Sequence, residues 1–209
     1  ISIAALVKAA AQQKMPAVAM TDHANLMGAF HFVRDILFHN KAAEAKNKAA
    51  IENGEEPTEV PMKPIVGCEF FVCEDHKNKS VKDNGYQIVL LAKTKKGYHN
   101  LAKMSSIAYT EGFYYVPRID RKVIQQYKED IIVLSGNLYG EIPNKILNIG
   151  ENQAEEALIW WKNEFKEDFY IEVMRHNQED ENRVNESLIS LARKHEVKII
   201  ATNNTFYID

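Results

Sequence analysis

Histidines and carboxylates lie at or near the ends of several apolar runs that predict β-strands. His23 follows the run Ala17–Thr21, Glu69 lies inside Ile65–Cys73, and His176 follows Phe169–Met174. In parallel α/β folds the carboxyl ends of the strands meet at one edge, where ligands bind. Imidazole and carboxylate groups gathered there are suited to a metal site or an acid–base pair. Polar groups also end two further runs: Ser135-Gly136-Asn137 and Thr202-Asn203-Asn204.

Each of these residues also has a structural interpretation. Asp22 is typical of a cap on the next helix, and His23 could equally be a hydrogen-bonded loop residue. His176 follows Arg175 and could simply position a loop. Glu69 is flanked by apolar residues, so its carboxylate should meet a cation or an arginine. The remaining histidines are predicted at the surface: His31, His39, His76, His99 and His195.

Other catalytic motifs are not present in the sequence. The glycines at 136 and 140 lack the spacing and the Lys-Ser/Thr of a phosphate-binding loop, and no Gly-x-Ser-x-Gly elbow occurs. Cys68 and Cys73 lack zinc-cluster spacing, and their odd separation in one strand places them on opposite faces, which predicts reduced, buried thiols. Lys93, Lys95, Lys96 and Lys103 form a basic cluster near Tyr98, which is more typical of a solvated helix start than of a nucleic-acid contact.

The elements that must position these residues alternate along the chain. A helix over Ala4–Gln13 is capped by Ser2, and a longer helical pattern begins at Leu26 with an apolar stripe of Phe30, Val33, Leu37 and Phe38. Six buried strands are predicted: Ala17–Thr21, Ile65–Cys73, Gln87–Ala92, Ile131–Leu134, Phe169–Met174 and Val197–Thr202. The later helices are Gly97–Ala108, a short one capped by Asp120 and ending at Tyr127, Glu141–Asn148, Asn152–Phe165 and one from Asn177 or Gln178 to about His195. This βαβα order predicts a single α/β domain, 1–209, with a parallel sheet or barrel.

Composition and charge exclude several classes of protein. The 209 residues are 45% hydrophobic and 26% charged, which is ordinary for a globular domain and unlike disordered, collagen-like or membrane chains. With 26 basic and 29 acidic residues the net charge is −3, so this chain alone should bind DNA weakly at physiological salt. The absence of a signal sequence and of a membrane-spanning run predicts a cytoplasmic protein without membrane contact.

Read together, the strand-end segments resemble the PHP (polymerase and histidinol phosphatase) domain at the amino end of bacterial replicative DNA polymerase III alpha subunits. The similarity extends over nearly the whole chain in one order, and its last aromatic block, Glu111–Asp120, is specific to the polymerase branch. The matching pieces are Thr21–Ala29, Pro64–Glu69, Ile88–Lys93, Gly97–Leu101, Glu111–Asp120, Arg175-His176, Arg183–Glu186 and Ala201–Asn203.

The resemblance implies a distorted (β/α)7 barrel of PHP type. Six strands are predicted here, and a first strand would precede Ile1, where family members carry a His-x-His pair of metal ligands. We therefore expect that first strand to be missing from this chain. The stretch 41–62 is longer than the family's link and is expected to be an insertion, with Lys41–Glu52 a solvated helix and Gly54–Pro64 a loop.

The resemblance also identifies metal-ligand positions, and most of them depart from the family pattern. His23 and Glu69 are retained. The departures are Gln87 in place of a histidine, Asn137 in place of a cysteine, and Asn204 and Phe206 in place of an Asp-x-His pair. Neutral amides are weak ligands and phenylalanine cannot ligate. We therefore expect a degenerate domain without catalytic residues, in which Gln87 and Asn204 satisfy each other's hydrogen bonds.

The implied function is that of a scaffold within a DNA-directed DNA polymerase. Its expected partners are the polymerase domains of the same chain, the proofreading exonuclease subunit and, through the parent chain, primer–template DNA. No cofactor is expected in this segment, and magnesium is expected in the parent polymerase. The alternative is an active phosphoesterase or 3′–5′ exonuclease with zinc or manganese held by His23, Glu69 and the His-x-His pair expected before Ile1. An unrelated barrel hydrolase is a third, weaker interpretation.

Overall fold

Apolar runs bounded by polar turns form one seven-stranded sheet in the computed structural model, which describes residues 1–207. Six of its strands follow the order β1-β2-β3-β5-β6-β7, and β4 pairs with β2. All six predicted strands are present and β4 is the addition, but β7 is exposed along its length and is not buried as predicted. The strands are β1 (Ala17–His23), β2 (Lys63–Cys73), β3 (Tyr86–Ala92), β4 (Arg118–Asp120), β5 (Ile131–Leu134), β6 (Phe169–Val173) and β7 (Lys198–Ala201).

The sheet is mixed, whereas a parallel sheet was predicted. β3 runs antiparallel to both β2 and β5, while β2/β4, β5/β6 and β6/β7 are parallel. A parallel neighbour requires a crossover, commonly a helix, and the segment between Cys73 and Tyr86 contains none. The apolar run in β3 reflects burial of both faces, which a covered mixed sheet provides as well as a parallel one.

The chain divides into two compact units. The first comprises Ile1–Met20, Met27–Val66 and the chain from Thr205, and the second comprises Thr21–Leu26 and Gly67–Asn204. Most predicted site residues lie in the second unit.

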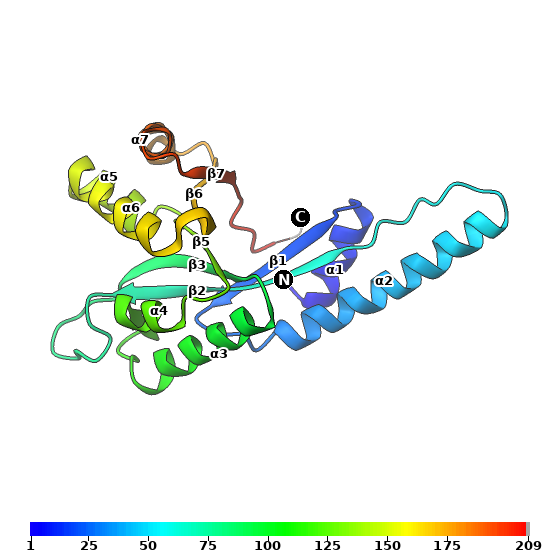
Figure 1. Ribbon diagram of the computed structural model, residues 1–209, viewed down its shortest axis with the longest axis horizontal. Helices are drawn as coiled ribbons and strands as arrows, with labels where there is room; N and C mark the ends of the chain where they lie inside the picture. Colours follow the sequence, from blue (N-terminus) through cyan, green and yellow to red (C-terminus); the bar gives the residue numbers. More distant parts are fainter. Residues whose placement is uncertain (208–209) are drawn as a thin grey trace. The chain divides into compact units, whose positions relative to one another are not determined.

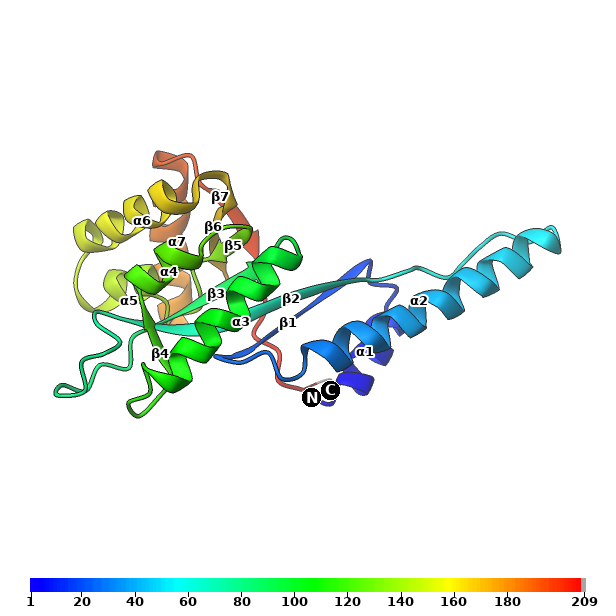
Figure 2. The ribbon, with the colours of Figure 1, turned by 60° about the horizontal axis from the view of Figure 1, so that its bottom comes forward.

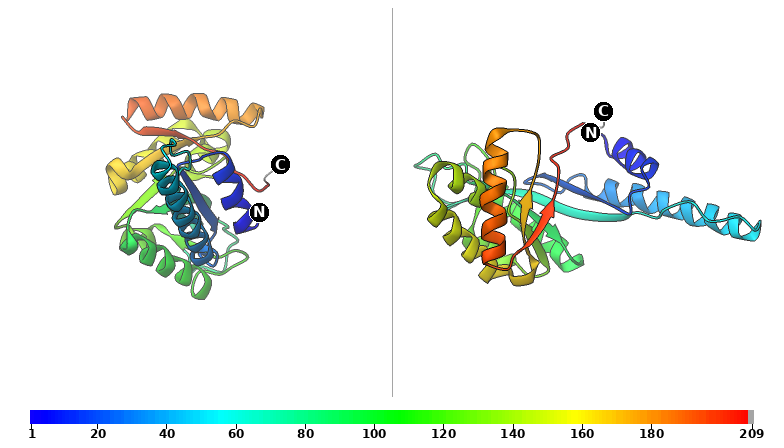
Figure 3. Two further views of the ribbon diagram at one scale, coloured as in Figure 1. Left: turned by 90° about the vertical axis from the view of Figure 1, so that its right-hand side faces the viewer. Right: turned by 90° about the horizontal axis from the view of Figure 1, so that it is seen from above.

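Helices of the second unit pack against its strands, as Figures 1 and 3 show. α3 contacts β3 and β4, α6 contacts β5 and β6, and α7 contacts β6 and β7. The core between them contains Phe70, Leu90 and Trp161, each fully buried. These helices match the predicted ones: α3 (Lys95–Thr110), α4 (Arg121–Tyr127), α5 (Glu141–Asn148), α6 (Glu151–Phe165) and α7 (Glu179–Lys194), with a 3-10 turn at Lys166–Asp168.

Both cysteines are buried and free, as predicted. Burial raises the pKa of the Cys68 thiol, and burial raises that of Cys73 to about 11. Neither thiol carries appreciable thiolate at neutral pH.

Two helices in the first unit lie side by side, α1 (Ile3–Gln12) and α2 (Ala29–Glu52), as seen in Figure 2. The predicted cap of α1 is confirmed, because the Ser2 hydroxyl accepts the Ala5 amide at 3.3 Å. The predicted apolar stripe of α2 is wrong: Phe30, Leu37 and Phe38 are 71%, 51% and 62% exposed. The buried face instead carries Ala29, Phe32, Ile36 and Ala43, which have similar helical spacing. A helix with apolar residues on two faces cannot be oriented by periodicity alone.

The stretch 41–62 continues α2 for its last three turns and then returns alongside it. Asn40 and Met62 exchange two hydrogen bonds of 2.8 and 2.7 Å, and Asn47 and Glu59 exchange two of 2.9 and 3.0 Å. The side-chain amides of Asn40 and Asn47 thus hold the segment that follows α2 against the helix. That this stretch is an insertion stays a prediction.

None of the helices within residues 1–207 is long and apolar enough to span a membrane.

Candidate functional site

Two of the predicted site residues lie close together: His23, which ends β1, and Glu69, in the middle of β2. The His23 Nε2 lies 3.5 Å from the Glu69 Oε1, with the histidine side chain 51% exposed and the glutamate 9% exposed. Asp22 belongs to β1 and not to a helix cap, because α2 begins at Ala29, with Gly28 at its N-cap and no side-chain cap bond. The expectation that Asp22 caps this helix is therefore wrong.

The Glu69 carboxylate is buried with little compensation. Its Oε1 has no hydrogen-bond partner among the described residues. Burial raises the pKa of Glu69, the nearby His23 opposes that effect, and Glu172 adds to it. The predicted cationic neighbour is thus a half-exposed imidazole.

Gln87 and Asn137, two of the positions where charged or thiol ligands are expected, bond to each other. The Asn137 Nδ2 donates to the Gln87 Oε1 at 3.1 Å, and the Asn137 Oδ1 accepts the Tyr139 amide at 2.8 Å. Gly136 allows this close approach, since it has φ of +84° and a Cβ there would lie 2.5 Å from the Gln87 carbonyl oxygen. The expected Gln87–Asn204 pair is wrong, because the Gln87 amide oxygen bonds Asn137 instead.

A second buried carboxylate, Glu172 in β6, was not singled out from the sequence. Its oxygens accept the Gly136 amide at 3.0 Å and the Thr202 hydroxyl at 2.5 Å, and its own amide donates to the Ser135 hydroxyl at 2.9 Å. Burial raises its pKa, and the bonds from Thr202 and Gly136 partly offset that rise. The signal was available, since Glu172 is a lone carboxylate in an apolar strand, like Glu69.

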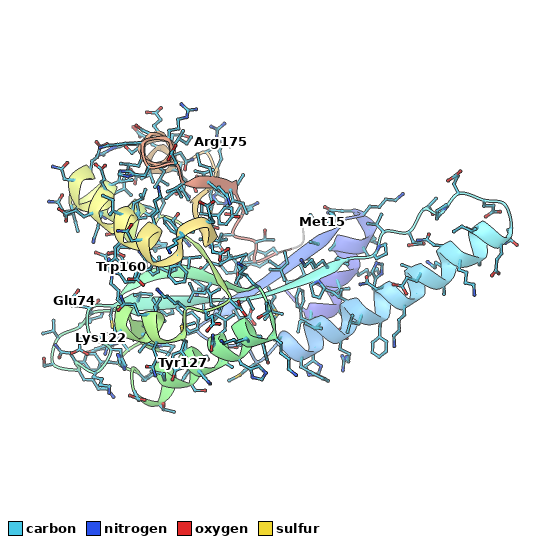
Figure 4. The ribbon with its side chains drawn as sticks, in the orientation of Figure 1. Met15, Glu74, Lys122, Tyr127, Trp160 and Arg175 are labelled. Carbon is cyan, nitrogen blue, oxygen red and sulfur yellow. The ribbon has the colours of Figure 1, made fainter. Side chains whose placement is uncertain are left out.

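His176 holds the chain that follows β6, beside the Arg175 labelled in Figure 4. Its Nδ1 lies 2.5 Å from the Glu181 Oε1 and its Nε2 lies 2.6 Å from the Asn203 Oδ1. The hydrogen bonds to Glu181 and, to a smaller extent, to Asn203 raise the pKa of His176. Burial alone would raise the pKa of Glu181, but its contacts with His176 outweigh burial, so the pKa of Glu181 is lowered. Both ring nitrogens are occupied, so the loop-positioning interpretation holds.

Asn137, Glu172 and His176 border one pocket of about 200 Å³ in the second unit, whereas His23, Glu69 and Gln87 do not line it. Asn204 is at its rim, whereas Phe206 belongs to the first unit and is 54% exposed. The polar lining consists of Asn137, Glu172, His176, Gln178, Glu181 and Asn204.

The remaining histidines and the lysine cluster differ from one another in burial. His31 and His99 are exposed as predicted, and His39 and His195 are half-buried. His76 is 6% exposed, so its predicted surface position is wrong; the cause is a bond to Asp120, distant in sequence.

The lysine cluster lies at the start of α3. Lys93 pairs with Asp168 and Lys96 with Glu129, which agrees with a solvated helix start.

The donors left at the family ligand positions do not fit a multinuclear metal centre. His23 and the unpartnered oxygen of Glu69 supply one imidazole and one carboxylate, while the amides of Gln87 and Asn137 are bonded to each other. Catalytic zinc sites use three protein ligands, and adjacent cations need more negative charge than one carboxylate.

The fold and the sequence together define the class. The chain belongs to the PHP domain family, which it matches over residues 1–176. It is also similar along nearly its whole length to proteins named DNA polymerase III subunit alpha. The subunit of Borreliella burgdorferi is 36% identical over 99% of this chain and 17% of the relative, and that of Aquifex aeolicus is 35% identical over 100% of this chain and 17% of the relative. The subunit of Thermus aquaticus is 37% identical over 92% of this chain and 14% of the relative. The chain thus spans about a sixth of the length of these curated relatives.

Proposed function

We propose that this chain is the PHP module of a replicative DNA polymerase alpha subunit, and that the module is a non-catalytic scaffold. The observation that carries the proposal is the hydrogen bond of 3.1 Å between Gln87 and Asn137, at two positions where metal-binding relatives are expected to offer a histidine and a cysteine. The two amides are tied to each other, the Asn137 Oδ1 also accepts the Tyr139 amide, and neutral amide oxygens are weak ligands for a cation.

In this role the module braces the polymerase domains of its parent chain. The parent would extend primers on template DNA by nucleotidyl transfer with magnesium in a separate domain. The module would also offer a docking surface to the proofreading exonuclease subunit. Similarity to the polymerase subunits supports the parent activity, and the family membership supports the module.

The test measures metal content and phosphoesterase activity of protein that carries the upstream strand with the expected His-x-His pair, with His23→Ala and His99→Ala as matched variants. We expect no phosphatase or exonuclease activity above the His23→Ala background with zinc or manganese added. Activity that His23→Ala abolishes and His99→Ala preserves would overturn the scaffold proposal.

One observation favours a second function, a metal-dependent phosphoesterase. The buried Glu69 Oε1 has no partner among residues 1–207 and faces His23, as expected of a ligand awaiting a cation. This alternative predicts that one metal ion per chain is retained in His76→Asn and lost in His23→Ala.

A further inference from the structure

A second histidine–carboxylate pair joins His76, in the loop between β2 and β3 that begins at the Glu74 labelled in Figure 4, to Asp120, the last residue of β4. The His76 Nδ1 lies 2.6 Å from the Asp120 Oδ2, and the His76 amide donates to the same oxygen at 3.4 Å. Asp120 also caps α4, through its Oδ1 and the Val123 amide at 3.0 Å. The imidazole is therefore held in one orientation by a carboxylate that is itself fixed.

Arg118 fixes the backbone around His76. Its guanidinium is fully buried, and its Nη2 donates to the His76 carbonyl at 3.2 Å. Gly112 is required beside it, because a Cβ there would lie 1.9 Å from the Arg118 carbonyl oxygen. The other carbonyls that accept from the guanidinium are those of Asn78, Asp83 and Gly112.

The other ring nitrogen of His76 is unsatisfied. Its Nε2 is buried and has no hydrogen-bond partner in the described part of the chain. It faces the Glu111 carboxylate at the end of α3, whose Oε2 is 3.9 Å away. A buried polar atom without a partner carries a desolvation cost and requires an explanation.

A third carboxylate lies beside the same ring. One oxygen of Asp75, one ring nitrogen of His76 and one oxygen of Asp120 all lie within 4.8 Å of one another. Asp75 is exposed, with its Oδ1 accepting the Lys77 amide at 2.9 Å, and Glu111 is 48% exposed, so the Glu111 side chain can adjust toward the buried His76–Asp120 pair.

We propose that the Nε2 of His76 and the carboxylates of Glu111 and Asp75 bind a divalent transition-metal ion of the zinc class. Imidazole nitrogen and carboxylate oxygen are zinc ligands, and a zinc-bound histidine characteristically donates its other ring N–H to a carboxylate, the role of Asp120 here. Two donors at about 2.0–2.2 Å on a tetrahedral ion lie about 3.3–3.6 Å apart. Glu111 therefore needs to approach His76 by about half an ångström.

Lys77 is the competing cation. Its Nζ lies 3.3 Å from the Glu111 Oε2, and its side chain is 68% exposed. A metal ion would displace it into solvent at small cost, since exposed ion pairs are weak. None of these residues is at a PHP ligand position, so the proposal is independent of the proposed function.

The experiment is a calorimetric titration of the chain with Zn²⁺ alone, at neutral pH. We expect saturable binding of one ion, at least tenfold weaker in Glu111→Gln and abolished in His76→Asn. His23→Ala and Glu129→Gln, the latter another exposed acid paired with a lysine, should leave the affinity unchanged.

Circular dichroism identifies variants that fail to fold. If the buried His76→Asn substitution unfolds the chain, Glu111→Gln at a half-exposed position still decides the question. No binding at micromolar Zn²⁺, binding unaffected by Glu111→Gln, or binding lost in His23→Ala would each overturn the proposal.

Discussion

The two histidine–carboxylate pairs of the second unit are built in opposite ways. His23 and Glu69 are 3.5 Å apart, with half of the imidazole exposed. His76 and Asp120 are 2.6 Å apart, and their side chains are only 7% and 4% exposed. The family resemblance draws attention to the first pair, but the second has the shorter contact and the greater burial.

The two carboxylates respond differently to burial. Burial raises the pKa of Glu69, and half-exposed His23 does not reverse it. Burial also acts on Asp120, but the bonds from His76 and the Val123 amide outweigh it and lower the pKa of Asp120. The surroundings of Glu69 thus disfavour its charged form, because burial outweighs the contact with His23, whereas those of Asp120 favour it.

The largest effect should come from breaking the buried pair. Asp120→Ala removes the partner of His76 and the cap of α4 together, and we expect a loss of about 3–5 kcal/mol in the free energy of unfolding. Urea denaturation monitored by circular dichroism measures it. Glu74→Ala, at an exposed acid of the loop that holds His76, is the control and should change stability by less than about 0.5 kcal/mol. A loss below about 1 kcal/mol for Asp120→Ala would show that the pair is not structural.

The second-largest effect should come from acid, which removes the contribution of the His76–Asp120 pair to the free energy of unfolding. Because the folded-state pKa of Asp120 lies below its ordinary value of 3.8, its contribution is present above that value and is lost as pH falls through the folded pKa. Urea denaturation midpoints from about pH 5 downward should fall in the wild-type chain. The decline should be shallower in Asp120→Asn, and equal slopes in the two chains would contradict this assignment.

Glu69→Gln should have a smaller effect of the opposite sign. A raised carboxyl pKa means that stability falls as pH rises above the ordinary value of 4.5, since the folded chain retains the proton more tightly. At neutral pH the amide avoids a buried charge, so we expect a gain of up to about 1 kcal/mol that disappears at lower pH. Thermal melts at pH 7 and at about pH 4 compare the two conditions. A loss of several kcal/mol would mean that a charged Glu69 is essential to the fold.

The smallest effect belongs to His23→Ala. With the imidazole half exposed and 3.5 Å from its partner, we expect a change of less than about 0.5–1 kcal/mol in the free energy of unfolding. The same urea assay measures it, with His99→Ala as the exposed reference. A larger loss would place His23 in the structural core of the unit and remove the contrast with His76.

Local patterns predicted the elements well and their pairing less well. The six predicted strands and the caps Ser2 and Asp120 depend on neighbouring residues, which a linear pattern records. The antiparallel β3 and the buried face of α2 depend on tertiary contacts. The polar segment between Cys73 and Tyr86 contains no crossover helix, and this feature of the sequence indicates that β3 runs antiparallel to β2.

The candidate site could be predicted only as a set of positions. The sequence indicated His23, Glu69, Gln87 and Asn137, but the partner of Gln87 depends on the sharp turn at Gly136. Burial of His76 comes from Asp120, 44 residues away, and no local pattern contains that contact. Glu172, like Glu69, is a single carboxylate within an apolar strand, so the same sequence pattern predicts a buried carboxylate at both positions.

The buried cysteines make the chain convenient for site-specific labelling. Maleimides and iodoacetamides react with thiolates, and burial keeps both Cys68 and Cys73 protonated and covered at neutral pH. A cysteine introduced at an exposed position, such as Tyr139 or Val81, would carry a fluorophore or spin label almost alone. The native thiols, left in place, would then report unfolding by becoming reactive.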